Sequence, residues 1–215
     1  GDPSLMTLKA VSCIKKCNVL AVPRTNGENT LALKITSGAV DISEKQIEYL
    51  DFLMIHDPDK LAKNHNYLAK QITVHLDAGR DVAVLNLGDA SLYSSYSYLC
   101  RILLKQGYQV ETIPGVTSFC ACAALLNQSL TDVHEPLHIL PASMPDLPSA
   151  LALIGGKVLM KSGRALPEVI NLIRREGLNE HSTLVADCGL PSQHIFSNID
   201  KATDEGYFST ILITP

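Results

Sequence analysis

The chain has 215 residues, 46% of them hydrophobic and 19% charged, and no stretch approaches the roughly 20 uninterrupted apolar residues of a membrane-spanning helix. Its 18 basic and 22 acidic residues give a net charge of -4, and no Lys/Arg cluster is present, which argues against nucleic acid as a partner. No signal peptide is visible, so we expect a cytoplasmic protein, with residues ahead of Gly1 because no initiator Met is present.

The first half of the chain alternates between helical and strand-like apolar patterns. Apolar residues three or four apart predict helices, and continuous apolar runs predict buried strands. We expect helices at residues 5–16, 30–40, 59–78 and 93–106, and strands at 18–23, 46–53, 81–87 and 109–113. The alternation, with 81–87 as a central strand, predicts a doubly wound parallel sheet.

The second half begins after the pair Pro114-Gly115, which interrupts the pattern and marks the expected domain joint. The expected helices are 116–126, 148–154 and 167–175, and the expected strands are 138–140, 157–160, 183–186 and 208–213, with 193–199 as a possible antiparallel addition. The sequence therefore predicts an α/β protein of two α/β domains. Residues 1–113 would carry a parallel sheet and residues 114–215 a smaller mixed sheet.

Six cysteines raise the question of a metal site or disulfides. Cys13 and Cys17 lie one helical turn apart, which leaves zinc conceivable. The chain has no Cys-x-x-Cys pair, however, and reads as cytosolic. We therefore expect reduced, mostly buried thiols and no metal.

The candidate site follows the apolar run that ends at Leu87. A Gly88-Asp89 turn there brings bare backbone and one carboxylate to the rim of a sheet, where ligands of α/β proteins bind. The expected lining, Gly88, Asp89, Tyr93, Thr117 and Ser118, suits a ligand with cationic or hydroxyl-rich parts better than a polyphosphate. Asp89 as a plain turn or capping residue is the alternative.

The common nucleotide-binding motifs and the serine-hydrolase motif are absent from the chain. It has no Walker loop, no Gly-x-Gly-x-x-Gly after the first strand and no Gly-x-Ser-x-Gly. The function must therefore be sought in other segments.

Three segments together resemble the tetrapyrrole methyltransferases, a family that depends on S-adenosylmethionine. Leu85-Asn-Leu-Gly-Asp-Ala-Ser-Leu-Tyr-Ser-Ser-Tyr96 is similar to the family's Gly-Asp-Pro-x-x-Tyr segment, with Ala90 in place of the usual proline. Ile113-Pro-Gly-Val-Thr-Ser118 resembles its Pro-Gly-x-Thr/Ser joint. Gly1-Asp-Pro-Ser-Leu-Met-Thr7 resembles the end of its N-terminal loop.

The resemblance implies a class III methyltransferase fold, a homodimer, and a cleft between the two domains that holds cofactor and substrate. It implies S-adenosyl-L-methionine as cofactor and S-adenosyl-L-homocysteine as product. The residues carried over as cofactor-binding are Gly88, Asp89, Ala90, Tyr93, Thr117, Ser118, Met160 and Gly189, with Thr210 as a weaker candidate. For Met160, an ordinary place in the core is the alternative.

Within the family, the chain most resembles the precorrin-2 / cobalt-precorrin-2 C20-methyltransferases. The segments that carry this are Val22-Pro23-Arg24, Tyr93-Ser-Ser-Tyr96 and Ala186-Asp-Cys-Gly189. The implied reaction is attack of the ring carbon C20 on the sulfonium methyl, followed by loss of a proton. No catalytic residue is evident; the candidates for accepting this proton are Asp2, Asp89, Tyr93 and water. The Leu-x-Leu-Gly-Asp run looks more like the branch that uses the cobalt-containing substrate.

The implied small-molecule substrate carries many carboxylates, although the chain is net acidic. Arg24, Lys161 and Arg164 follow expected strands and would pair with carboxylates, unless they are ordinary surface charges. Two other functions stay open. One keeps the fold and cofactor but changes the acceptor, to another tetrapyrrole position, a protein histidine derivative or ribosomal RNA. The other is a non-catalytic cofactor-binding protein.

Overall fold

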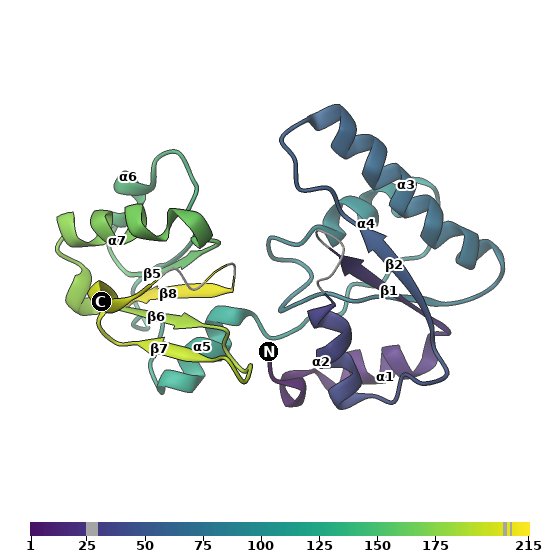
Figure 1. Ribbon diagram of the computed structural model, residues 1–215, viewed down its shortest axis with the longest axis horizontal. Coiled ribbons are helices and arrows are strands. Elements are labelled where there is room, and N and C mark those ends of the chain that lie inside the picture. Colours follow the sequence, from purple (N-terminus) through teal and green to yellow (C-terminus); the bar gives the residue numbers. More distant parts are fainter. Residues whose placement is uncertain (25–29, 204–205, 207) are drawn as a thin grey trace. The chain divides into compact units, whose positions relative to one another are not determined.

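The computed structural model describes residues 1–24, 30–203, 206 and 208–215, and the chain forms two compact units (Figure 1). One unit is Asp2–Val116, and the other is Thr117–Pro215 together with Gly1. Each unit is built on its own β-sheet. Among the described residues, no helix combines the length and apolar character needed to cross a membrane.

The Asp2–Val116 unit holds a parallel three-stranded sheet in the order β2-β1-β3. Its strands are β1 (Val19–Arg24), β2 (Gln46–Asp51) and β3 (Val82–Val84). Its helices are η1 (Pro3–Leu5), α1 (Leu8–Lys16), α2 (Leu31–Ala39), α3 (Pro58–Asp77) and α4 (Tyr96–Lys105).

Helices cover both faces of this sheet because β1 carries apolar side chains in both directions (Figure 1). Leu20 and Val22 pack into a core shared with α1 and α2. Ala21, between them, packs into the second core with residues of α3 and α4. A strand buried on both faces reads as a continuous apolar run, as the sequence around β1 does.

One strand expected in this unit does not form. Residues 109–113 run without strand pairing, so β1 is the central strand and β3, expected to be central, lies at the edge of the sheet. Val110 packs against the core under α3 and α4, and the Thr112 hydroxyl lies 3.2 Å from that of Tyr96. The apolar pattern of 109–113 therefore reflects side-chain packing. The spacing of apolar residues in a sequence does not by itself distinguish such packing from strand pairing.

The other unit holds a mixed five-stranded sheet in the order β4-β5-β8-β6-β7. Its strands are β4 (Leu137–Pro141), β5 (Gly156–Met160), β6 (Ser182–Ala186), β7 (His194–Phe196) and β8 (Ser209–Ile213). Strand β4 is parallel to β5, whereas β8 is antiparallel to β5 and β6. The mixed character is as expected, but this sheet, expected to be the smaller, has more strands than the first.

The helices of this unit are α5 (Ser118–Leu126), α6 (Leu147–Leu151) and α7 (Leu166–Arg175), with short 3-10 turns η2 (Gly163–Ala165), η3 (Asn179–His181) and η4 (Ile199–Lys201). The main core joins α6 and α7 to one face of the sheet, through Leu159 and Ile211 among others. Thr210, next to Ile211, points to the opposite face, where its hydroxyl reaches Ser118 of α5. The polar end of α5 therefore lies against β8.

Candidate functional site

The loop after β3 carries the Gly-Asp motif, and it is built around the Asp89 carboxylate. Oδ1 accepts a hydrogen bond from the Ser91 amide at 2.8 Å and another from the Ser91 hydroxyl. Oδ2 accepts one from the amide of Gly115 at 2.8 Å. The motif and the Pro-Gly joint, which are 26 residues apart in sequence, are thus tied together by one side chain.

Glycine is required at two positions here, one in this loop and one in the Pro-Gly joint. Gly88 has φ +68°, in the left-handed region that glycine adopts without strain. A Cβ placed on Gly115 would lie 2.1 Å from the carbonyl oxygen of Gly88, so the two backbones touch. Gly88, Asp89 and Ala90 therefore present a backbone whose shape is set by Gly115.

The candidates for accepting the C20 proton have different surroundings. The Ser91 side chain, the Gly115 amide and the Ser91 amide lower the pKa of Asp89, and hydrogen bonds from Ser4 lower that of Asp2. A lower pKa makes a carboxylate a weaker base. Tyr93, with left-handed φ +49° and 41% exposed, lies in the same loop as Asp89.

The Thr117–Pro215 unit brings Ser118, Met160 and Thr210 together. Ser118 opens α5, and its hydroxyl lies 3.4 Å from that of Thr210, which is buried in β8. Met160 ends β5 directly opposite Thr210 in the strand register. Ser118 and Met160, two residues that the resemblance implies for cofactor binding, are therefore both neighbours of Thr210.

Two thiols that were not among the predicted site residues, those of Cys122 and Cys188, also lie here. Cys122 of α5 is fully buried, and burial and the neighbouring Cys188 thiol raise its pKa to about 12. Cys122 also interacts with Thr210. Because Cys188 precedes Gly189, this contact brings the Gly189 loop to α5. The position of Cys188 next to a carried-over glycine was the only signal for it in the sequence.

Thr117 supplies a polar atom that fits a bound ligand. It is the residue before α5, yet its side chain makes no capping hydrogen bond. Its Oγ1 atom is buried and has no hydrogen-bond partner among the residues that the structure describes. A buried hydroxyl without a partner is costly, and a ligand group that bonds to it would remove that cost.

The N-terminal cysteines form a separate pair. Burial and the adjacent Cys13 raise the pKa of Cys17 to about 12, so its thiol is protonated at neutral pH. Within the described ranges, no group of three or more His, Cys, Asp or Glu side chains is arranged to hold a metal ion.

Arg24 ends β1, and its guanidinium already has partners. Nε and Nη2 donate to the two carboxylate oxygens of Asp51 at 2.9 and 2.8 Å, and the group stacks over the Tyr49 ring at 4.3 Å. Asp51 raises the pKa of Arg24, so it stays cationic. A substrate carboxylate would have to share Arg24 with Asp51.

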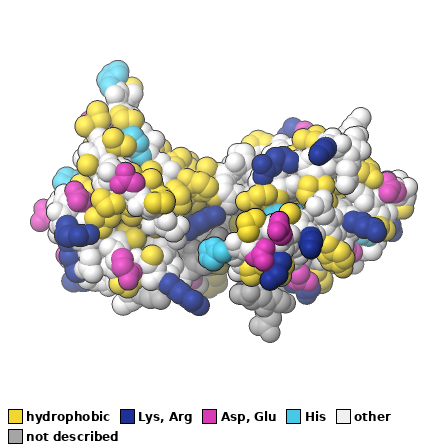
Figure 2. All heavy atoms as spheres, turned by 90° about the horizontal axis from the view of Figure 1, so that it is seen from above, with side chains coloured by type: hydrophobic (Ala, Val, Ile, Leu, Met, Phe, Trp, Pro, Cys, Tyr) yellow, Lys and Arg dark blue, Asp and Glu magenta, His cyan; other side chains and the backbone are white. Residues whose placement is uncertain are grey.

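The other two basic residues expected to pair with substrate carboxylates follow β5. Lys161 comes directly after Met160 in a left-handed conformation, and Arg164 is exposed in η2. On the face drawn in Figure 2, Lys and Arg side chains are interspersed with acidic ones and form no continuous basic field. Nucleic-acid binding relies on such a field.

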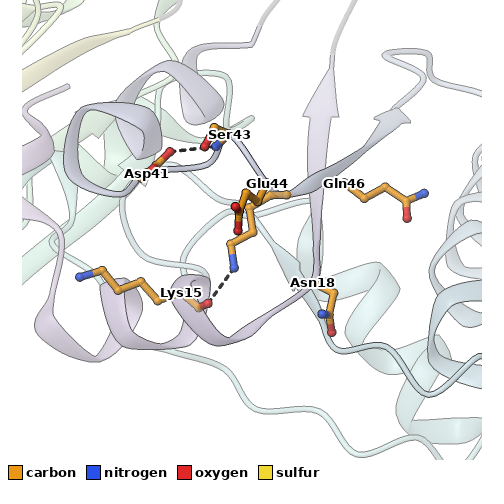
Figure 3. Close-up of a pocket in the computed structure, with 7 residues that line it drawn as sticks. Lys15, Asn18, Asp41, Ser43, Glu44 and Gln46 are labelled. Carbon is orange, nitrogen blue, oxygen red and sulfur yellow. Dashed lines mark hydrogen bonds between the residues drawn. The ribbon is translucent and has the colours of Figure 1, made fainter.

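A polar pocket of about 450 Å³ is drawn in Figure 3. It adjoins the amino ends of β1 and β2. Asp89 follows the carboxyl end of β3, so it lies at the other end of this parallel sheet. The Lys45 ammonium donates to the carbonyls of Lys15 and Cys17 at 2.7 and 2.8 Å, and Asp41 accepts from the Ser43 amide at 3.0 Å. The Lys45 and Asp41 side chains therefore serve to complete the end of α1 and a turn.

Residues 1–202 match the family of tetrapyrrole (corrin/porphyrin) methylases. The chain belongs to this family. It is 31% identical to a precorrin-2 C(20)-methyltransferase of a Sinorhizobium species, over 99% of this chain and 91% of that protein. It is 35% identical to a probable cobalt-precorrin-2 C(20)-methyltransferase of Methanocaldococcus jannaschii, over 81% of this chain and 73% of that one.

Solved structures show the same fold. A cobalt precorrin-4 methyltransferase superposes with a TM-score of 0.78 at 18% identity, over 100% of this chain and 90% of that one. A uroporphyrin-III C-methyltransferase from Thermus thermophilus, complexed with S-adenosylhomocysteine, gives 0.71 at 19% identity, over 99% and 92%. The expected family, its class III α/β fold and a methyltransferase activity are confirmed.

Proposed function

We propose that the protein transfers a methyl group from S-adenosylmethionine to C20 of precorrin-2, or of its cobalt complex, in cobalamin biosynthesis. The observation that carries the proposal is the loop after β3, where the Asp89 carboxylate ties the Gly-Asp motif to the Pro-Gly joint at the carboxyl edge of a parallel sheet. Ligands of open α/β sheets bind at that edge. The relatives named C(20)-methyltransferases support the substrate and the carbon.

We propose that each of two domains, 1–113 and 114–215, contributes cofactor-binding residues. The first supplies the backbone of Gly88, Asp89 and Ala90, with Tyr93 beside it. The second supplies Thr117, Ser118, Met160 and Gly189, among which the Oγ1 of Thr117, buried and without a partner in the described part of the chain, fits a hydrogen-bonding ligand. When bound, the cofactor supplies the electrophilic methyl group.

The chain's own contribution is alignment and a dry site. A reduced tetrapyrrole is electron-rich at its meso carbon, so methyl transfer needs no prior proton abstraction, and correct placement of the two reactants lowers the barrier. A proton leaves C20 afterwards. Tyr93, water and the less basic Asp89 and Asp2 are the candidates to receive it, and no catalytic residue is assigned.

The substrate proposal includes Arg24, whose stacked guanidinium would pair with a peripheral carboxylate of the ring. The cytoplasmic location and the homodimer remain part of the same proposal. They rest on the character of the sequence and on the resemblance to the family.

The decisive experiment incubates the protein with methyl-labelled S-adenosylmethionine and either metal-free or cobalt-loaded precorrin-2. We expect label at C20 of one of the two substrates, and we expect the cobalt-loaded one. Label at another ring position would overturn the C20 assignment. Tight S-adenosylhomocysteine binding without label in either ring would favour another acceptor or a non-catalytic role.

A further inference from the structure

One peptide unit, that between Pro114 and Gly115, is held at both ends by side chains from distant parts of the sequence. Its N–H donates to Oδ2 of Asp89 at 2.8 Å. Its carbonyl accepts from the Thr7 hydroxyl at 3.2 Å. The carbonyl and the N–H of one trans peptide point in opposite directions, so the two side chains hold the group from opposite sides.

Both holding side chains are themselves fixed. The Thr7 hydroxyl also accepts from the amide of Ala10 at 3.2 Å and so caps α1. The other oxygen of Asp89 accepts from the Ser91 amide at 2.8 Å and from the Ser91 hydroxyl. A peptide held between two fixed partners has little freedom to rotate.

The same peptide sets the position of Gly88 in the loop after β3, where the cofactor is proposed to bind. Gly115 touches the Gly88 carbonyl so closely that a Cβ on Gly115 would lie 2.1 Å from that oxygen. Rotation of the Pro114–Gly115 peptide would therefore displace Gly88. The three sequence segments that resemble the family, ending at Thr7, centred on Asp89 and spanning the joint, all meet at this one group.

We propose that the side chains of Asp89 and Thr7 are positioning groups, which act on the cofactor through the Pro114–Gly115 peptide and the Gly88 backbone rather than by touching it. A carboxylate has about four acceptor sites, and three hydrogen bonds from Ser91 and Gly115 already use the Asp89 group. This explains why position 89 needs Asp rather than Asn. An Asn side chain has the same shape, but its one oxygen would accept from either Ser91 or Gly115, and its NH2 group would face a donor of the other residue. The inference rests on the proposed binding of S-adenosylmethionine.

The first test measures amide hydrogen exchange at Gly115 in the ligand-free protein. We expect a protected amide in wild type and exchange faster by roughly tenfold or more in Asp89→Asn, because the charged acceptor is lost. Thr7→Val should quicken exchange less, and Thr7→Ser, which keeps the hydroxyl, should restore protection. Unchanged exchange in Asp89→Asn and Thr7→Val would overturn the inference.

The second test measures S-adenosylhomocysteine affinity by calorimetry. Asp89→Asn should weaken binding by roughly tenfold and Thr7→Val by several-fold, whereas Thr7→Ser should stay near wild type. Because both residues hold one peptide, the double variant should lose less than the product of the two single effects. Ser129→Ala is the matched control, since its hydroxyl also donates to a backbone carbonyl, at 2.6 Å, and its effect should simply multiply with that of Thr7→Val.

The outcomes separate this inference from the proposed function. Faster exchange with unchanged affinity, or effects that multiply in the double variant, would overturn positioning through the peptide. If wild type does not bind S-adenosylhomocysteine at all, the proposed function fails, and with it the link from the peptide to the cofactor. Exchange at Gly115 still reports whether the two side chains hold it.

Discussion

The two units use the polar groups of the candidate site in opposite ways. In Asp2–Val116, the Asp89 carboxylate accepts hydrogen bonds from the Gly115 amide and from Ser91. In Thr117–Pro215, the Thr117 hydroxyl is buried without a partner among the described residues, and the Thr210–Ser118 pair is long at 3.4 Å. The first unit thus uses its polar side chains to shape a backbone surface, whereas the second leaves hydroxyls available to a ligand.

This difference has a consequence for mutagenesis. Changes at the loop after β3 should affect folding and cofactor affinity together, because the groups removed hold the protein itself. Changes at Thr117 should affect affinity without a loss of stability, because a group with no internal partner contributes nothing favourable to folding. The following experiments test that contrast.

The largest effect is expected for Gly115→Ala. The new Cβ would lie 2.1 Å from the Gly88 carbonyl oxygen, so backbone must move, and we expect a loss of a few kcal/mol in the free energy of unfolding together with loss of S-adenosylhomocysteine binding. Urea denaturation and calorimetry measure the two. Gly79→Ala is the control: a Cβ there would meet no described atom outside its chain neighbours within 4 Å, and although its φ of +71° makes Ala strained and costs some stability, this variant should keep full affinity. Normal affinity in Gly115→Ala would remove this contact from the site.

Arg24→Ala should weaken binding of the tetrapyrrole by roughly 1.5–3 kcal/mol, as for a lost charged hydrogen bond, and leave cofactor affinity nearly unchanged. Arg24→Lys should recover part of the loss because an ammonium lacks the planar two-point contact. Asp51→Asn removes the negative charge that now pairs with Arg24, and it should therefore tighten binding of the tetrapyrrole. Equal losses for ring and cofactor in Arg24→Ala would indicate general destabilisation instead.

Thr117→Val keeps the shape of the side chain and removes a hydroxyl that has no partner among the residues described. We expect S-adenosylhomocysteine affinity to fall by about 0.5–1.5 kcal/mol, the net contribution of a neutral hydrogen bond, while the melting temperature stays equal or rises. Thr117→Ser should retain affinity. A lower melting temperature with unchanged affinity would show that the hydroxyl supports the fold, and the contrast between the units would fail.

The smallest expected effect is on the stability of the protein at low pH. Hydrogen bonds lower the pKa of Asp89 in the folded protein from the ordinary 3.8, so its contribution to stability is fully present above that value and is lost as pH falls through the folded pKa. The difference in unfolding free energy between wild type and Asp89→Asn should be constant from about pH 5 upward and shrink below pH 3.8. Denaturation series at several pH values measure it, and a difference that grows in acid would contradict the assignment.

Much of the fold follows from local patterns in the sequence. The cap of α3 illustrates this: Asp57 accepts from the amides of Asp59 and Lys60, and Pro58 follows at the first helical position. Such signals act within one or two turns of chain, so the order of helices and strands is readable. The strand expected at 109–113 was wrong because its apolar spacing does not say whether a neighbouring strand is available to pair with it.

Motifs in the sequence predict the residues of the candidate site, but they do not predict the connections between these residues. The sequence by itself determined that Asp89 follows a buried strand and that Pro114-Gly115 interrupts the chain. Only the tertiary structure decided that Asp89 and Thr7 hold the same peptide, the latter across 107 residues, and that Cys188 lies against Cys122. Hydrogen bonds and steric contacts act over a few ångströms in space, and only the folded chain brings residues so far apart in sequence within that distance.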